Sequence, residues 1–554
     1  MRGSQSRGAT AAIRTIVLTV LLAGVAGGAH AEPVVAVGSE HFGNVFQEGE
    51  PADLTIRVTA DPDHDLTGRV HVAAHDAYRV SAGRLTFRVH LRAGDSVVRV
   101  FRLRYRHIGH LTLAVKLERS DGRRLARADT TAAIVPAVDE SAPAEASGVG
   151  YFVLPFDSEL PMADGIAEEM RRLGIRWARF SYGWWNDDRL VRPDTNDPLW
   201  LDTTSFERWV DAYRAHGIEV LGVLFGTARW ASSAPDDETD LAGISRWGLV
   251  APADLNDWRL FVHTLAQRLQ GRVTSWEVWN EPDITVFWQS SPEDFTQLAL
   301  VAASTLREVD PEIRIVLNLV DRVTPYGLNF RDVLLGGAGS VFDVFGYHYG
   351  GADFVAAARA IQPMLRGDGT LWNTEAYGAP RRHISRWLEQ RSLGMDRIFP
   401  FIYHTIFDDS AFPAAQRFGI YPVNLDYTPR PDGVALRTMS DQVGSAVPTG
   451  GGPVGLGYSA YTFATPGGPT VALADLDDIG QTWSGPPGVF LWLRVPSAVR
   501  SIEVVDLMGN RTVRRVHRGK LRIRMLGVAA FLHADPPGAL TQVEIRRARR
   551  APRR

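Results

Sequence analysis

Short runs that alternate apolar and polar residues fill the chain from Val34 to about Val135. Residues 54–58 and 97–103 are two such runs, and turn residues such as Asp121-Gly122 stand between runs. Period two is typical of half-buried strands, and helical periodicity is missing from this region. The pattern predicts an N-terminal β-sandwich with an Ig-like arrangement over residues 32–135.

From residue 148 onward the pattern changes to strands and helices in turn. Thr204 and Glu207 form a predicted capping box, and the apolar residues that follow recur at helical spacing. Gly217 ends this helix before an apolar run over residues 218–225. Each such unit is typical of a βα repeat.

Eight strands are predicted in this region. They lie at residues 150–154, 175–180, 218–225, 273–280, 313–319, 342–347, 370–374 and 397–405. The helices between them include one capped by Asp164 that runs to Leu173 and one that begins at Ser291-Pro292. Eight βα units over about 300 residues match a TIM barrel. A doubly wound open sheet is the competing fold, but its glycine-rich phosphate loop is not evident.

The rest of the chain flanks the predicted barrel, which spans residues 148–445. Residues 136–147 are rich in Ala, Pro, Ser and acidic residues and are predicted to be a linker. Short alternating runs return after the barrel and predict a C-terminal β-sandwich over residues 446–546. Residues 547–554 are predicted to be a solvated, disordered basic tail. The predicted fold class is α/β: a (β/α)8 TIM barrel flanked by an N-terminal Ig-like β-sandwich and a C-terminal β-sandwich.

The first 31 residues have the pattern of a secretory signal peptide. Three arginines precede an apolar run from Ile16 to Val25, and small residues then lead to Ala29-His30-Ala31. The apolar run is shorter than the roughly 20 residues that span a bilayer, which favours cleavage near Ala31 over membrane anchoring. The mature protein is therefore expected to be secreted or periplasmic.

Length, composition and charge limit the expected number of domains and the classes of binding partner. A chain of 554 residues exceeds what one hydrophobic core usually supports, so two or three domains are expected. The formal charge of -3 and the pI near 6.6 give no field that would attract nucleic acid or an anionic membrane, so neither is expected as a partner. The absence of cysteine excludes disulfides, thiolate metal sites and cysteine nucleophiles.

Two glutamates stand at the ends of predicted barrel strands, where the active sites of such barrels lie. Glu281 is at the end of the fourth strand and Glu375 at the end of the seventh. Hydrolysis of a glycosidic bond with retention needs one carboxyl group that protonates the leaving oxygen and another that attacks the anomeric carbon, roughly 5–5.5 Å apart. A pair at two strand ends favours this chemistry over the alternative of two solvated charges.

The run Trp279-Asn280-Glu281-Pro282 resembles the W-N-E-P motif of clan A glycoside hydrolases, in which the glutamate is the acid/base. Thr374-Glu375-Ala376-Tyr377 resembles the nucleophile motif on strand seven of the same clan. Within the clan, the run over residues 276–282 and the appended β domains are most similar to glycoside hydrolase family 39. The resemblance implies a retaining O-glycosidase that needs no metal or organic cofactor, with an oligo- or polysaccharide as its substrate.

The resemblance carries further residues with it. The segment over residues 173–179 resembles the clan's second strand, which implies that Arg179 holds Glu375 ionised. Arg176 is the rival, and strand alternation allows only one of the two arginines to point inward. Asn280 resembles the asparagine that hydrogen-bonds the sugar 2-hydroxyl.

Residues 343–350 resemble the sixth strand, where related enzymes often carry His-x-Tyr or His-Tyr-Tyr. His348 is carried over as a substrate-binding residue. Tyr347 and Tyr349 both remain candidates for contact with the nucleophile, and Tyr349 is the one we assign to the site. Gly350 stands where a tyrosine is found in some relatives, so this part of the motif departs from the pattern.

Several aromatic residues are candidates to stack on sugar rings. Trp184 and Trp185 follow the second strand and Trp230 follows the third, although packing at the barrel mouth explains them equally well. The eighth strand lacks the tryptophan found there in several clan families, and Tyr403 or His404 could replace it.

Two other functions are possible. A catalytically silent polysaccharide-binding barrel is disfavoured because both glutamates are present. A metal-dependent hydrolase on a similar barrel would need a His-x-His pair on the first strand, and residues 148–154 contain no histidine. Family 39 resemblance implies β-xyloside, iduronide or exopolysaccharide substrates, and the sequence leaves the sugar, the linkage, exo or endo action and the oligomeric state open.

Overall fold

The computed structural model describes residues 32–103, 108–139, 141–241, 244–321, 323–367, 369–376, 383–404, 422–476 and 488–550. The predicted signal peptide, Tyr377 of the nucleophile motif and the last four residues lie outside this part of the chain. In the described part, no helix is long and apolar enough to cross a membrane.

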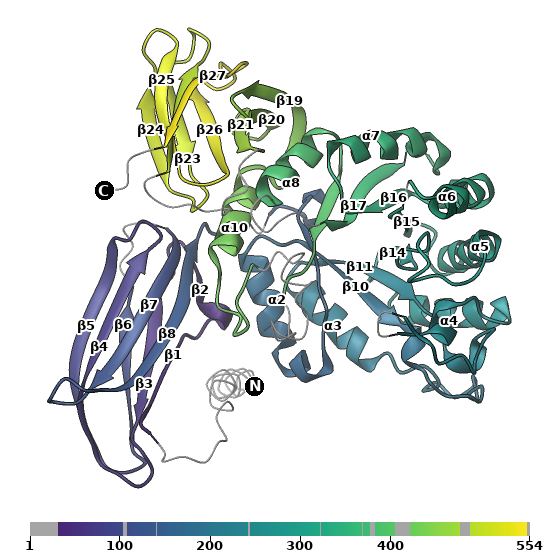
Figure 1. The fold of residues 1–554 in the computed structure, drawn as a ribbon, viewed down its shortest axis with the longest axis horizontal. Helices are drawn as coiled ribbons and strands as arrows, with labels where there is room; N and C mark the ends of the chain where they lie inside the picture. The colour runs from purple at the N-terminus through teal and green to yellow at the C-terminus, as the bar shows by residue number, and fades with distance from the viewer. Residues whose placement is uncertain are drawn as a thin grey trace, which may run out of the picture.

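Eight parallel strands form the centre of the molecule (Figure 1). Their order in the sheet is β18-β17-β16-β15-β14-β11-β10-β9. They span Gly150–Phe152 (β9), Trp177–Gly183 (β10), Glu219–Phe225 (β11), Ser275–Val278 (β14), Arg314–Leu319 (β15), Val344–His348 (β16), Thr370–Ala376 (β17) and Arg397–Pro400 (β18). The main-chain N–H of Ile398 donates to Gly148 O at 3.1 Å and that of Tyr403 to Phe152 O at 2.9 Å, which joins the two end strands. The predicted eight-stranded parallel barrel is therefore confirmed, in preference to an open sheet.

In the described part of the chain, one α-helix follows each barrel strand. The helices span Ala163–Arg172 (α2), Thr204–Ala215 (α3), Leu255–Arg268 (α4), Pro292–Val309 (α5), Pro325–Ala338 (α6), Ala352–Ile361 (α7), His383–Ser392 (α8) and Pro431–Val443 (α10). Short 3-10 turns lie at Phe42–Asn44, Ala144–Ala146, Asp157–Met162, Trp184–Asn186, Arg229–Ala231, Arg246–Leu249, Gly339–Val341 and Gln362–Met364, and a small hairpin joins Asp240–Leu241 (β12) to Ile244–Ser245 (β13).

The helix starts agree with the sequence only in part. The helix α5 begins at Ser291-Pro292, with the proline at the first helical position, as predicted, and Ser291 also caps it in a capping box. The predicted capping box at Thr204 is wrong, because Thr204 is the first helical residue and Thr203 precedes it in the cap position without a side-chain cap hydrogen bond. The cap at Asp164 is also wrong, because the 3-10 turn before α2 runs directly into the helix and leaves Asp164 inside its first turn.

A layer of large apolar side chains fills the interior of the barrel. Its members are fully buried: Trp177, Leu221, Val316, Val344, Trp372 and Phe399. Side chains alternate between the two faces of a strand, so residues two positions further toward the carboxyl ends also point inward. Trp177 therefore places Arg179 above this layer, and Val316 places Asn318 there. The apolar layer is the floor on which polar side chains converge.

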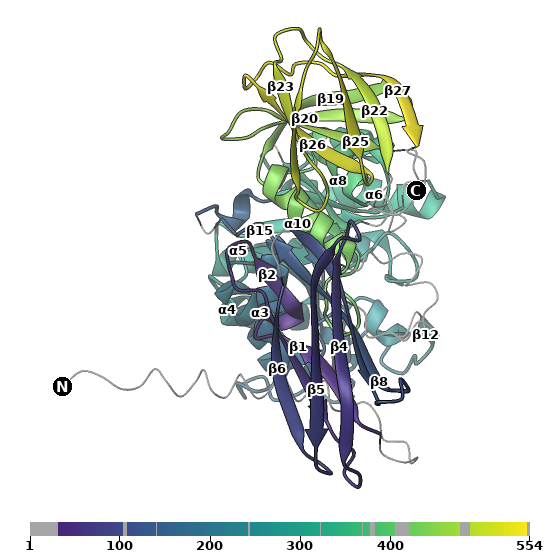
Figure 2. The same cartoon turned by 90° about the vertical axis from the view of Figure 1, so that its left-hand side faces the viewer.

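Two sheets of the N-terminal region enclose one apolar cluster. One has the order β1-β3-β6 and the other β2-β8-β7-β4-β5. The strands span Val34–Gly38 (β1), Val45–Gln47 (β2), Asp53–Thr59 (β3), Leu66–Asp76 (β4), Ser81–Leu91 (β5), Ser96–Arg102 (β6), Gly109–Glu118 (β7) and Arg124–Val135 (β8). Ile56 of the first sheet and Val72 and Val115 of the second lie in the same buried cluster. Figure 2 shows these long strands in front of the barrel and reaching below it.

Two further sheets follow the barrel, ordered β19-β20-β21-β26-β23-β24 and β25-β22-β27. Their strands span Val447–Gly455 (β19), Tyr458–Ala464 (β20), Thr470–Asp475 (β21), Val489–Arg494 (β22), Ser501–Val505 (β23), Arg511–Arg515 (β24), Lys520–Met525 (β25), Ala529–Asp535 (β26) and Glu544–Arg550 (β27). The prediction of a disordered tail from residue 547 is wrong through Arg550. These residues belong to β27, which pairs with β22, and Ile545 anchors the strand in the buried cluster.

The flanking regions contact each other and the barrel. The Tyr78 hydroxyl donates to Asp506, which joins the N-terminal and C-terminal sheets. The predicted linker over residues 136–147 lies against the barrel, where Trp177 Nε1 donates to Ala144 O at 3.2 Å and Arg397 Nη2 donates to Glu145 O at 2.6 Å. The three regions therefore form one assembly, with the linker as part of its packing.

We expect Leu221→Ala to destabilise the barrel by about 2–5 kcal/mol, because it leaves a cavity in the fully buried layer. Scanning calorimetry of purified protein gives the measurement. Leu199→Ala makes the same change at a side chain that is 81% exposed and should shift stability by no more than about 0.5 kcal/mol. Equal effects of the two changes would contradict the assigned layer.

Candidate active site

Glu281 and Glu375 approach each other at the carboxyl end of the barrel. Glu375 lies on β17, and Glu281 lies three residues beyond the end of β14, so it is on a turn rather than at the strand end that the sequence predicts. One carboxylate oxygen of each and one ring nitrogen of His348 all lie within 4.8 Å of one another. Both glutamates are buried, at 5% and 6% exposure. Electrostatic interactions between these carboxyl groups and neighbouring charges are therefore stronger than they would be in water.

The turn that carries Glu281 has an unusual backbone. Trp279 has φ of 68° and Glu281 has φ of 48°, both in the left-handed region that side chains rarely adopt. Asn318 Oδ1 accepts the Glu281 N–H at 2.8 Å, and Asn318 Nδ2 donates to Trp279 O at 2.8 Å. One amide on the neighbouring strand thus holds both ends of the turn and aims Glu281 into the barrel mouth.

Arg179 lies at the centre of the site and is fully buried. Its Nη1 donates to Glu375 Oε2 at 3.2 Å, and its Nη2 donates to Asn280 Oδ1 at 2.9 Å and to His348 Nε2 at 3.4 Å. Arg176 points the other way and donates to Ala142 O at 2.8 Å in the linker. Of the two arginines that the sequence offered, Arg179 is the inward one.

Glu277 is a site residue that sequence reasoning missed. It is fully buried, receives the Arg179 Nη2 and Nε donors, and accepts from Asn318 Nδ2 at 2.7 Å. The sequence did contain a signal for Glu277. It lies within a predicted barrel strand, and a carboxylate that is buried there must be paired with a positive charge or a hydrogen-bond donor. Two residues past Ser275 it faces the barrel interior, where Arg179 needs a counter-charge.

His348 lies between Glu281 and Arg179. Its Nε2 accepts from Arg179, so its Nδ1 carries the proton and donates to Glu281 Oε1 at 2.7 Å. Burial lowers the pKa of His348 to about 4, which keeps the ring neutral. Glu281 therefore receives one hydrogen bond from an uncharged donor.

Tyr349 is the tyrosine that reaches Glu375, and its hydroxyl donates to Glu375 Oε1. The ring of Tyr347 packs instead on Phe354, with 4.4 Å between ring centroids. Tyr349 has φ of 57° and follows a shift in the pairing of β16 with β17, which turns the chain toward the site. The structure thus separates the two tyrosines that the sequence could not.

The two glutamates have different electrostatic surroundings. The pKa of Glu281 is raised to about 7, chiefly by burial; Arg179 opposes this shift and Glu277 contributes to it. Burial also raises the pKa of Glu375, but Arg179 and the Tyr349 hydroxyl bind its carboxylate directly and favour the charged form. Two carboxyl groups this close do not both ionise readily, and the proton that they share belongs on Glu281.

One group of potential metal ligands lies in the described part of the chain, and it consists of Glu281, His348 and Glu375. The Arg179 guanidinium already contacts two of these three side chains. A second positive charge there would meet this fixed cation, so the group is better suited to share a proton than to bind a metal ion.

Among the predicted aromatic residues, Trp184 does not offer a face to a sugar. It is 1% exposed, and its ring lies flat on Phe261 with 4.6 Å between centroids, so the expectation that it stacks on substrate is wrong. Trp185 is half-buried beside Gly226, where a Cβ atom would lie 2.6 Å from its ring. Trp230 is half-buried and donates to Asp187 at 2.9 Å.

The two candidates that the sequence offered after the eighth strand, Tyr403 and His404, bind residues other than Glu281 and Glu375. Tyr403 donates to Glu169 at 2.7 Å, and His404 stacks on Tyr427 with 4.1 Å between centroids. The aromatic residue that the eighth strand brings toward the site is Phe401, which sequence reasoning missed. It stacks on Phe152 at 5.1 Å, and the Arg179 guanidinium lies over the same Phe152 ring at 5.1 Å.

The barrel region is similar to known glycoside hydrolases. Residues 154–317 match the family model described as glycosyl hydrolases family 39. The barrel is related to that family. β-Xylosidases of Caldicellulosiruptor saccharolyticus and Geobacillus stearothermophilus are 28% and 27% identical, over 151 and 182 residues. The matches cover 26% and 30% of this chain, and the chain spans only 30% and 34% of those relatives' lengths.

A solved family 39 glycoside hydrolase from the gut symbiont Bacteroides cellulosilyticus WH2 has a similar fold. The TM-score is 0.65 at 17% identity, and the match covers 88% of this chain and 98% of that one. Because the match covers 88% of this chain, the shared fold includes regions on both sides of the barrel.

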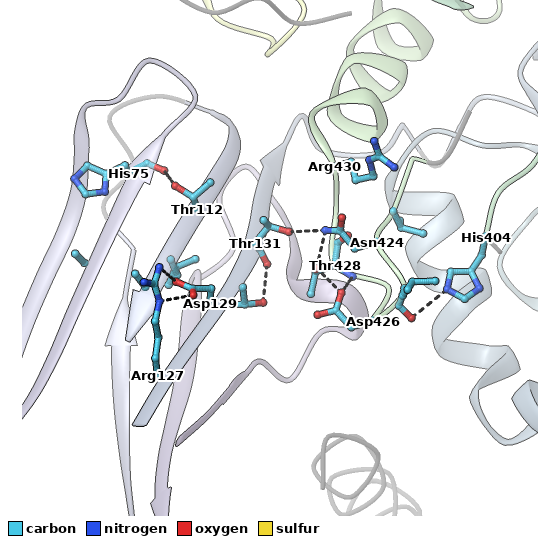
Figure 3. Close-up of a pocket in the computed structure, with 16 residues that line it drawn as sticks. His75, Thr112, Arg127, Asp129, Thr131, His404, Asn424, Asp426, Thr428 and Arg430 are labelled. Carbon is cyan, nitrogen blue, oxygen red and sulfur yellow. Dashed lines mark hydrogen bonds and ion pairs between the residues drawn. The ribbon is translucent and has the colours of Figure 1, made fainter. Parts of the chain in front are cut away.

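A cavity of about 780 Å³ lies away from Glu281 and Glu375, between β7, β8 and the segment after residue 421 (Figure 3). Its polar side chains bind one another: Asn424 donates to Thr131 at 3.3 Å, and Thr428 donates to Asp426 at 2.6 Å. None of the residues that contact the two glutamates lines it. It is a space between regions, without the convergent groups that catalysis needs.

We expect Glu277→Gln to destabilise the protein by about 3–5 kcal/mol, because Arg179 would lose one of its two buried carboxylate partners. A thermal unfolding scan gives the measurement. Glu308→Gln makes the same change in an exposed ion pair with Arg259, which is 2.6 Å long, and should cost about 1 kcal/mol or less. If Glu277→Gln were as mild as this control, the pairing of Arg179 would be misassigned.

Proposed function

We propose that the protein is a retaining glycoside hydrolase that cleaves glycosidic bonds of an oligo- or polysaccharide by double displacement. The observation that carries the proposal is the pair of buried glutamates, with an oxygen of each and a nitrogen of His348 all within 4.8 Å. Retaining enzymes hold their two carboxyl groups about 5–5.5 Å apart, whereas inverting enzymes leave about 6.5–9.5 Å for a water molecule. The family 39 match supports the same class of reaction.

In the first step Glu375 attacks the anomeric carbon and forms an ester bond to it. The glycosidic C–O bond breaks, and the proton of Glu281 passes to the leaving oxygen. In the second step the Glu281 carboxylate takes a proton from water, whose oxygen attacks the anomeric carbon. The ester bond then breaks and returns Glu375 as a carboxylate, so both residues regain their starting states.

The neighbouring residues have distinct roles in this proposal. Arg179 and Tyr349 keep Glu375 charged for attack, and His348 orients Glu281 without adding a charge. Asn280 uses its carbonyl oxygen to accept from Arg179, which leaves its amide N–H groups for the substrate. They are suited to donate to a sugar 2-hydroxyl, an interaction that strengthens in the transition state.

Substrate, location and the flanking regions complete the proposal. The relatives named β-xylosidase favour a β-xyloside as substrate. An exopolysaccharide is the alternative that the sequence resemblance implies. The leader over residues 1–31 favours cleavage near Ala31 and a secreted or periplasmic enzyme. We also propose that the paired sheets before and after the barrel are β-sandwich domains, Ig-like in the N-terminal case, because each pair encloses one apolar cluster.

We expect Glu375→Gln to abolish turnover of aryl glycosides while sugar binding stays nearly intact, because the amide cannot form the ester. Turnover, calorimetric binding and trapping of a fluorosugar on residue 375 give the measurements, and Glu312→Gln on the surface is the matched control. Near-wild-type hydrolysis by Glu375→Gln would refute the assignment. A wild-type protein that binds sugars but cleaves none would be a silent binding protein, and an inverted first product in NMR spectra would refute retention.

We expect kcat/KM to fall above about pH 7, by about tenfold per pH unit, because Glu281 must be protonated to act as the acid. Its raised pKa means that the protonated form is present below pH 7 and is lost above it. Rates with a substrate whose leaving group needs a proton, measured from pH 5 to about pH 9, give the profile. Glu281→Ala should lose this limb on a substrate with an activated leaving group, and a wild-type profile that stays flat to pH 9 would contradict the role.

A further inference from the structure

The three-stranded sheet β25-β22-β27, part of the C-terminal region in Figure 2, has exposed basic residues on one face. Its other face is apolar and buried against the six-stranded sheet, with Leu491, Leu493 and Ile523 in the shared cluster. Strand alternation turns the intervening residues outward. The outward residues are Phe490, Trp492 and Arg494 on β22, Lys520, Arg522 and Arg524 on β25, and Arg547 and Arg549 on β27.

The pairing of the strands arranges these residues in rows. Trp492 is paired with Arg522 on one side and Arg547 on the other, and Phe490 is flanked in the same way by Arg524 and Arg549. Each row is therefore an aromatic ring between two arginines. We call the outward residues of these rows the arginine face.

The rings hold guanidinium groups against the sheet. Arg522 Cζ lies 4.8 Å from the Phe490 ring centroid, and Arg547 Cζ lies 5.1 Å from that of Trp492. Arginine stacked in this way keeps its N–H donors at the edge of the group, free to bind a planar carboxylate with two parallel hydrogen bonds. Because stacking already restricts the side chains, less conformational entropy is lost when a ligand binds.

The charge of this region is not balanced locally. Residues 488–550 contain 13 Lys and Arg but four Asp and Glu, in a chain whose net charge is -3. The acidic residue beside the arginine face, Glu544, is paired with Arg546 at 2.8 Å. Within the described residues, no carboxylate forms an ion pair with Arg522 or Arg547. The face therefore attracts anions.

We propose that the arginine face binds a polysaccharide that carries carboxylate groups, separately from the catalytic pair. The inference rests on the proposed function, which makes a polysaccharide the substrate of the same chain. A thin polymer can lie along the sheet and touch only this basic region. A vesicle or a nucleic-acid duplex would also meet the rest of the molecule, which is acidic overall and repels a broad anionic surface.

The test is binding of the full chain to polygalacturonate, with neutral xylan as the uncharged comparison, by calorimetry at low and high NaCl. We expect binding to polygalacturonate that weakens as salt rises, and no comparable binding to xylan through this face. The double change Arg522→Gln and Arg547→Gln should weaken binding to polygalacturonate by about tenfold or more, since two charge-assisted contacts are lost. Circular dichroism and the thermal midpoint establish that the variant is folded.

The matched control is Arg84→Gln with Arg88→Gln, which removes the same charge from exposed positions on β5. It should bind polygalacturonate like the wild type. Equal losses in the two double variants, or no loss in the first, would overturn the proposal. Tighter binding to anionic vesicles or duplex DNA than to polygalacturonate would overturn the choice of a polysaccharide. Binding is read without hydrolysis, so a failure here is distinct from a failure of aryl glycoside turnover, which tests the catalytic proposal.

Discussion

The buried guanidinium of Arg179 is the constraint on which the rest of the site depends. A charge fully removed from water is tolerated only if its partners offset a desolvation cost of several kcal/mol. Arg179 meets this demand with acceptors on Glu277, Glu375, Asn280 and His348. These contacts fix four barrel strands relative to one another beside the reaction centre: β10, β14, β16 and β17.

The same network makes two chemically identical carboxyl groups unequal. One of them, Glu375, receives a guanidinium and a phenol, while Glu281 receives a neutral imidazole. Environments that push two titratable groups apart assign their acid and base roles. The asymmetry arises from the backbone as well, because the left-handed turn at Glu281 and the turn at Tyr349 deliver side chains that straight strands would point elsewhere.

Much of the fold followed from local pattern. The eight strands were predictable because each apolar run is bounded by turn residues, and alternation within one strand separates Arg179 from Arg176. Alternation ends where the strand ends. The sequence could not distinguish Trp184 from Trp185, because both lie in a 3-10 turn after β10 where the period of two no longer applies.

Long-range pairing was the other limit. The role of Glu277 is clear only once Arg179 is known to lie beside it, and Arg179 stands 98 residues earlier in the chain. The basic residues near the C-terminus resemble a tail until β22 provides a partner for them. The same holds for Phe401, whose place at the site depends on Phe152 of the first strand.

The contacts of the flanking regions have a consequence for how this architecture can be altered. The turn around Asp506 binds Tyr78, and Asn510 donates to Ile108 O at 2.9 Å, so the first and last regions of the chain are joined without the barrel as intermediary. The segment 136–147 is bound to the barrel floor as well. The flanking regions are thus not independent domains joined only by linkers. Moving this barrel into another protein would expose surfaces on all three parts at once, and exchange of a single module would have to carry its neighbours' contact residues with it.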